Sequence, residues 1–80
     1  MSESASIRTE HRPAFEVRAN GVTRAVAAGA TVAEFLAAHD LDPDLVVVER
    51  NGAILSRAEF ERTPLAPGDA LEIVHFVGGG

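Results

Sequence analysis

Alternating apolar and polar residues predict a pair of strands at residues 15–19 and 22–26. In the first, Phe-Glu-Val-Arg-Ala, every second residue is apolar, which is typical of a strand with one buried face. Asn20-Gly21 separates the two segments, and both residue types tolerate the positive φ angles of a type I′ turn. The sequence therefore predicts a β-hairpin.

A helix is predicted after this hairpin, starting at Thr31. Thr31 and Glu34 have the spacing of a capping box, in which each side chain bonds the backbone of the other residue. The apolar face has the i, i+3, i+4, i+7 spacing of a helix, with members Val32, Phe35, Leu36 and His39. Pro43 cannot continue a helix, so the segment is expected to end near His39.

The second half of the chain predicts three further strands and one short helical turn. Residues 45–50 are rich in Val and predict an inner strand, which Asn51-Gly52 turns into a short strand at 53–55. Ser56 and Glu59 form a second capping box, and residues 71–77 predict the last strand.

The order β-β-α-β-β-β predicts an α+β domain: a mixed sheet of four to five strands with one main helix across it. The first and last strands are expected to be parallel neighbours at the sheet centre. We divide the chain into a disordered leader at 1–13, a domain at 14–77 and a flexible glycine tail at 78–80.

The tail, Gly78-Gly79-Gly80, follows the last strand without a polar linker. Glycine has no side chain and takes up positive φ freely, so such a tail can enter a narrow channel in a partner. Three interpretations remain: a frayed end, an added linker, or a carboxylate that a partner activates.

The amino-acid composition excludes several classes of partner and site. The formal net charge of −5 argues against nucleic acid and anionic membranes as partners. There is no Cys, no apolar run of membrane-spanning length and no signal-peptide pattern at the start, so a cytoplasmic location is expected. His11, His39 and His75 have no metal-ligand spacing, and we predict neither a metal site nor catalytic residues.

Together these segments resemble the ubiquitin-like sulfur carriers with the β-grasp fold, and above all those of the thiamine pathway. The resemblance rests on the stretches 20–21, 29–36, 46–52, 56–60, 67–69 and 76–80, in this order. It covers residues 15–80. Two departures are the longer leader and Phe60, where the family often has Trp.

The resemblance implies a protein that is acted on rather than an enzyme. An adenylating enzyme would use ATP to activate the Gly80 carboxylate, and no cofactor would be bound by the carrier itself. A sulfur donor, such as a cysteine desulfurase or a persulfide protein, would convert it to a thiocarboxylate. Thiazole synthase would then take the sulfur.

Strand alternation predicts where such partners dock. Val47, Val74 and Phe76 should point away from the helix and form an exposed apolar patch beside the tail. Two other functions stay open: a related carrier that supplies sulfur to molybdopterin or another metabolite, and a ubiquitin-like binding module or protein modifier.

Overall fold

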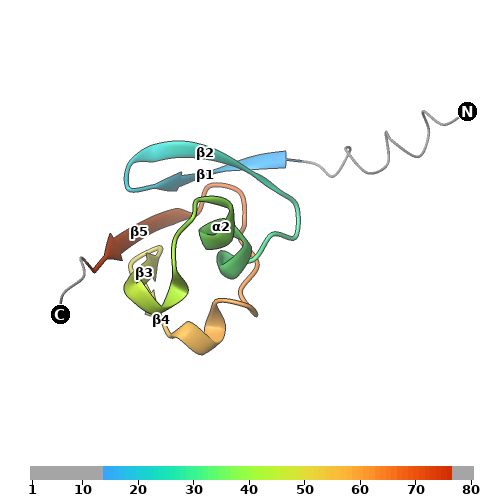
Figure 1. The fold of residues 1–80 in the computed structure, drawn as a ribbon. Helices are drawn as coiled ribbons and strands as arrows, with labels where there is room; N and C mark the ends of the chain where they lie inside the picture. Colours follow the sequence, from blue (N-terminus) through green and yellow to red (C-terminus); the bar gives the residue numbers. More distant parts are fainter. Residues whose placement is uncertain (1–13, 77–80) are drawn as a thin grey trace, which may run out of the picture.

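The structure, a computed structural model, describes residues 14–76. Within this range five strands form one mixed sheet in the order β2-β1-β5-β3-β4, and one α-helix lies against one of its faces (Figure 1). The elements are β1 Ala14–Ala19, β2 Val22–Ala27, α2 Val32–Ala38, η1 Pro43–Leu45, β3 Val46–Arg50, β4 Ala53–Leu55, η2 Arg57–Glu59 and β5 Ala70–His75. The predicted leader and glycine tail lie outside the described residues.

The last strand, β5, is the middle strand of the sheet. It pairs in parallel with β1, where Ala19 lies beside Leu71, and antiparallel with β3, where Val48 lies opposite Ile73. Parallel neighbours need a long crossover connection, and here the whole segment between β1 and β5 in sequence forms it. The predicted central position of the first and last strands is confirmed, as is the α+β fold with a mixed sheet and one main helix.

Helix α2 begins with the predicted capping box. The backbone N–H of Glu34 donates to Thr31 Oγ1 at 3.2 Å, and the N–H of Thr31 donates to Glu34 Oε1 at 2.9 Å. Val32, Phe35 and Leu36 are buried against the sheet, as their spacing predicted. Among residues 14–76 the buried apolar residues are Val17, Val26, Val32, Phe35, Leu36, Val46, Val48, Phe60, Leu65 and Leu71.

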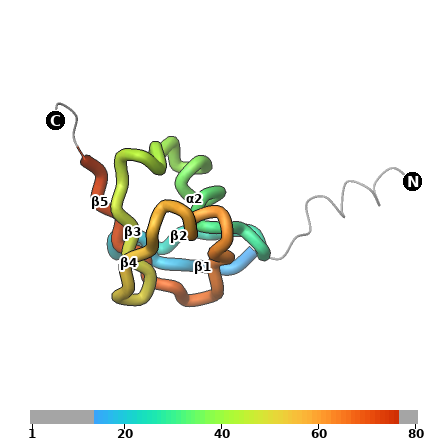
Figure 2. The backbone as a smooth tube through the Cα atoms, turned by 90° about the horizontal axis from the view of Figure 1, so that it is seen from below, coloured from blue at the N-terminus to red at the C-terminus, as the bar shows by residue number. Residues whose placement is uncertain are grey.

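The segment between β4 and β5 packs beside the start of α2 (Figure 2). The N–H of Ala33 donates to the Phe60 carbonyl at 2.9 Å, and the N–H of Leu65 donates to the Ala30 carbonyl at 2.8 Å. The second predicted capping box heads η2, where the N–H of Ser56 donates to Glu59 Oε1 at 3.0 Å. This segment thereby buries Phe60 and Leu65 against the helix side of the sheet.

Two strand boundaries were predicted wrongly. The last strand was expected over 71–77, but β5 ends at His75, one residue before the end of the described range. Leu45 was expected to start the strand at 45–50, but it is the last residue of the 3-10 turn η1, and it is 40% exposed. The reason is local: the Asp42 carboxylate accepts from the N–H of Asp44 at 2.9 Å, and the Leu45 N–H bonds the Asp42 carbonyl at 2.9 Å. Polar side chains that bond nearby backbone compete with strand pairing in this way.

Candidate functional site

The predicted apolar patch lies on the outer face of the sheet, which we define as the face opposite α2. Val46 and Val48 are buried under the helix, so Val47 between them points outward. Val47 lies directly opposite Val74 in the β3–β5 register. Val74 is 58% exposed and Phe76 is 53% exposed, whereas Val47 is half-buried. The register and burial agree with the predicted orientations of Val47 and Val74, and Phe76 is exposed as predicted. The role of these residues in partner binding stays a prediction.

Ile54 extends this patch and was missed by the sequence analysis. It lies on β4 opposite Glu49, on the outer face, and it is 67% exposed. A strand of three residues has too little alternation to reveal which face its middle residue takes. We call the four residues Val47, Ile54, Val74 and Phe76 the outer apolar patch. Exposed large apolar groups gathered on one face are typical of protein-binding sites.

Two Asn side chains hold β5 in place from either side. Both residues occupy Asn-Gly turns with φ of 52°. The N–H of Ile73 donates to Asn20 Oδ1 at 2.7 Å, and Asn20 Nδ2 donates to the Ile73 carbonyl at 3.1 Å. On the other side, the N–H of Ala70 donates to Asn51 Oδ1 at 2.9 Å. The sequence predicted these turns, but not that their amides bond the last strand.

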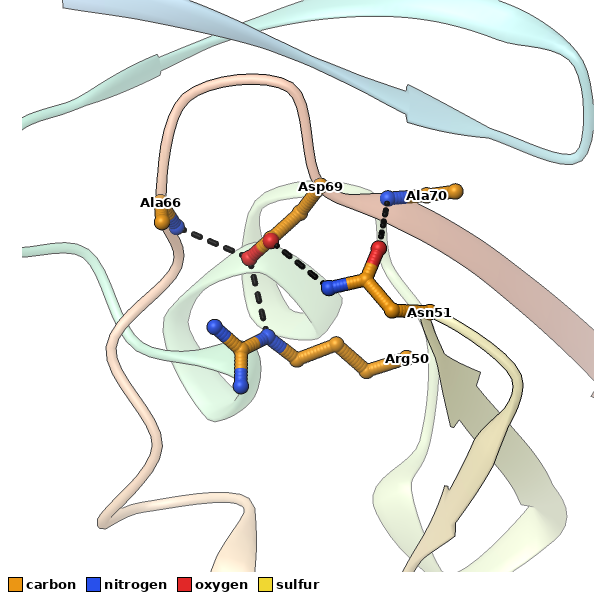
Figure 3. Close-up of polar contacts among 5 residues, drawn as sticks. All are labelled: Arg50, Asn51, Ala66, Asp69 and Ala70. Carbon is orange, nitrogen blue, oxygen red and sulfur yellow. Dashed lines mark hydrogen bonds and ion pairs between the residues drawn. The ribbon is translucent and has the colours of Figure 1, made fainter.

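A buried carboxylate, Asp69, anchors the start of β5 (Figure 3). It accepts hydrogen bonds from Arg50 Nε at 2.9 Å, Asn51 Nδ2 at 3.0 Å and the Ala66 N–H at 2.8 Å. Burial alone would raise the pKa of Asp69, but the hydrogen bonds from Asn51, Ala66 and Arg50, with the Arg50 charge, outweigh it. The pKa of Asp69 is therefore lower than that of an ordinary aspartate, and the carboxylate is ionised at neutral pH.

A hollow of about 340 Å³ on the helix side brings two of the three histidines near each other. Its lining includes Arg24, His39 and His75, and His39 Nδ1 lies 2.9 Å from the Phe35 carbonyl oxygen. His75 is an exposed strand residue opposite Val46. Within residues 14–76, no group of three His, Cys, Asp or Glu side chains is placed to hold a metal ion.

Phe76 is the last described residue before the glycine segment. Its N–H donates to the Leu45 carbonyl at 2.7 Å, which ties the backbone just after β5 to the end of η1. Gly80 follows Phe76 by four residues, which extended chain spans in at most about 14 Å. Gly78, Gly79 and Gly80 themselves lie outside the described residues. Gly80 is therefore separated from Phe76, a member of the outer apolar patch, by no more than this length of chain.

No helix within residues 14–76 is both long and apolar enough to cross a bilayer.

The parallel pairing of β1 with β5, the one α-helix among the described residues and the connecting turns define a β-grasp domain of the ubiquitin-like class. Comparison with known proteins identifies the family within this class. The model of the ThiS family matches residues 15–80, and the chain belongs to this family.

The similarity to a solved relative covers the whole of that relative. The crystal structure of the thiamine biosynthesis protein ThiS from Geobacter metallireducens superimposes with a TM-score of 0.70 at 36% identity. The match covers 82% of this chain and 100% of that one. The sulfur carrier protein ThiS of Bacillus subtilis is 42% identical over 50 residues, which are 62% of this chain and 76% of that protein.

A third relative is much longer. A thiazole synthase of Magnetococcus marinus is 37% identical over 65 residues, which are 81% of this chain but only 20% of that protein. This chain thus corresponds to about a fifth of that synthase.

Proposed function

We propose that this chain is the sulfur carrier for thiazole formation in thiamine biosynthesis. The observation that carries the proposal is the geometry of β5, the middle strand, which is held on both sides by Asn20 and Asn51. It leads from the outer apolar patch to a terminal segment of three glycines. Membership in the ThiS family supports the same reading.

In the first step the Gly80 carboxylate attacks the α-phosphorus of ATP in a partner enzyme. An acyl adenylate forms, and pyrophosphate leaves. This chain supplies the nucleophilic oxygen and the reach, while the partner supplies the nucleotide site. The carrier acts here as a co-substrate rather than as an enzyme.

In the second step the terminal sulfur of a donor persulfide attacks the activated carbonyl carbon, and AMP leaves. A second thiol then attacks the donor sulfur of the resulting acyl disulfide: a new disulfide forms between the donor and this thiol, the acyl S–S bond breaks, and the thiocarboxylate stays on Gly80. Thiazole synthase accepts this sulfur. The M. marinus relative supports this acceptor, because a segment similar to this chain is part of a protein named thiazole synthase.

The experiment that tests the proposal is intact-mass spectrometry of the carrier. The protein is incubated with its cognate activating enzyme, ATP and a persulfide donor, with an otherwise identical mixture without ATP as the control. We expect the mass increase for exchange of one oxygen by sulfur, only when ATP is present. If the cognate activating enzyme is shown to be active and the mass of this protein still does not increase, the proposal is contradicted.

A further inference from the structure

Two acidic residues face each other on the outer face of the sheet. Glu49 on β3 and Glu72 on β5 are direct partners in the antiparallel register. Side chains at such positions have Cβ atoms about 4.5–5.5 Å apart, and like charges there destabilise the sheet. Among residues 14–76 the ion pairs are Arg50 with Asp69 and Arg57 with Asp44, so neither glutamate takes part in an ion pair. Either Gln substitution would remove one of the two facing negative charges.

This acidic pair lies within the outer apolar patch. Val47 and Val74 form the next outward-facing pair along the same two strands, and Ile54 lies opposite Glu49 on β4. A partner that covers the patch must therefore also cover both carboxylates and remove water from them. Desolvated charges are strongly unfavourable unless the partner supplies an opposite charge and hydrogen bonds.

We infer that the activating enzyme docks on this face with an apolar surface that carries one basic side chain, which lies between Glu49 and Glu72. The inference rests on the proposed function, because it assigns the chemistry of the surface that binds the carrier. The basic side chain is an arginine, since its planar group has five donors and can bond two carboxylates together, whereas the lysine ammonium is a compact point charge. The negative net charge of the carrier also favours association with a basic surface.

The expected result is a trade between stability and binding. We compare Glu49→Gln, Glu72→Gln and the double variant with wild type, and use Glu61→Gln as the control for loss of one negative charge. Glu61 is exposed and belongs to the segment that packs beside the start of α2, away from the outer face. Two quantities are measured: the thermal midpoint of the free carrier, and its KM in ATP–pyrophosphate exchange by the activating enzyme.

Each single variant at the pair should keep or raise the thermal midpoint, because it removes the repulsion. Its KM should rise about tenfold, the effect of losing one charge-assisted hydrogen bond, while kcat at saturating carrier is retained. Added salt should raise the KM of wild type more than that of the double variant, because salt screens the charge pairing that only wild type makes. Glu61→Gln should match wild type in every measurement.

A sharper variant is Glu72→Arg, which places a cation opposite Glu49. It should raise the midpoint above that of Glu72→Gln and weaken binding further, because it repels the basic side chain of the enzyme.

Three outcomes would overturn the inference. KM values within twofold of wild type would show that the carboxylates are not part of the contact, while exchange by wild type in the same assay leaves the proposed function standing. A lower midpoint together with a higher KM would assign the pair a structural role. No exchange with wild type would reject the proposed function, and this inference with it.

Discussion

At the scale of single residues, Asp69 has the most demanding environment. It is the only buried charged residue in the described part of the chain, and three donors from separate segments meet at its carboxylate. These donors belong to the end of β3, the turn after it and the loop before β5. Asp69 therefore joins the start of the middle strand to its surroundings by charge-assisted hydrogen bonds, which are stronger than neutral ones.

Asp69→Asn should destabilise the domain by about 1.5–3 kcal/mol at pH 7, the contribution of hydrogen bonds to a charged group. Because the pKa of Asp69 is lowered on folding, its contribution is complete above the unfolded pKa of about 3.9 and is lost as the pH falls through the folded pKa. Urea unfolding at pH 7 and pH 3 should show a smaller pH dependence in the variant than in wild type.

The control for this prediction is Asp44→Asn. The Asp44 side chain is 72% exposed and lies 3.4 Å from Arg57 in a surface ion pair. Such pairs contribute at most about 1 kcal/mol. Equal losses in the two variants would show that the Asp69 network has no special importance.

Asn20 combines two tasks in one residue. Its φ of 52° suits the hairpin turn, and its amide bonds both backbone groups of Ile73. Asn20→Gly keeps the turn, because glycine tolerates this φ, but it removes both side-chain bonds. We expect a loss of about 1–3 kcal/mol, from two bonds of about 0.5–1.5 kcal/mol each.

Hydrogen exchange at the Ile73 amide measures this directly. Exchange should be faster in Asn20→Gly and intermediate in Asn20→Asp, which retains the acceptor but not the donor. Unchanged Ile73 exchange in the glycine variant would contradict the role of Asn20 in holding β5.

At the scale of elements, the packing of α2 on the sheet stabilises the domain. Phe35 is 4% exposed, and its ring centroid lies 4.2 Å from that of His39. Phe35→Ala should cost about 3–5 kcal/mol, as is usual for buried phenylalanines. This is comparable to the whole stability of many small domains.

Phe76→Ala is the matched control, because the same side chain is removed from a residue that is 53% exposed. Its free energy of unfolding should change by no more than about 0.5 kcal/mol. Thermal or urea unfolding compares the two variants, and similar stabilities would mean that the helix face is assigned incorrectly.

The elements were predictable from sequence because their signals are local. Thr31 and Glu34 lie one helical turn apart. The alternation of residues around Val47 and Val74 predicts which side chains lie on which face of the sheet. The Asn20–Ile73 bonds and the Glu49–Glu72 pair join residues far apart in sequence. They depend on strand order and register, which no local pattern determines, so they emerged only from the structure.

At the scale of the whole molecule, stability and docking are separated on the two faces of the sheet. The helix side buries the core, whereas the outer face exposes Val74 and Phe76. Val74→Asp should therefore leave the domain folded, with at most a small decrease of the thermal midpoint, and raise the KM for the activating enzyme, because it places a charge in the outer apolar patch. The KM is measured from the rate of pyrophosphate exchange at increasing concentrations of the carrier. An unchanged KM would show that the patch is not part of the contact with the activating enzyme.

The tail should be separable from the fold in the same way. Removing Gly79 and Gly80 deletes no side chain from the core, so the thermal midpoint should equal that of wild type. Adenylation should be abolished, because the new terminal carboxylate is withdrawn by up to about 7 Å of extended chain. Reacting atoms must approach to within about 3–3.5 Å, and β5 is held too firmly by Asn20 and Asn51 to follow.

Val74→Asp is the useful comparison for the truncated protein. Val74→Asp weakens docking on the enzyme, whereas the truncation shortens the reach of the terminal carboxylate. High concentrations of Val74→Asp should restore the wild-type exchange rate, because its carboxylate still reaches the nucleotide once the complex forms. No concentration of the truncated protein should do so, although it should still compete with wild type for the enzyme. If the truncated protein exchanges pyrophosphate at the wild-type rate, the length of the tail is not required for adenylation. If neither wild type nor the truncated protein supports exchange with an active enzyme, the glycine carboxylate is not the substrate, and a binding module becomes the better description of this domain.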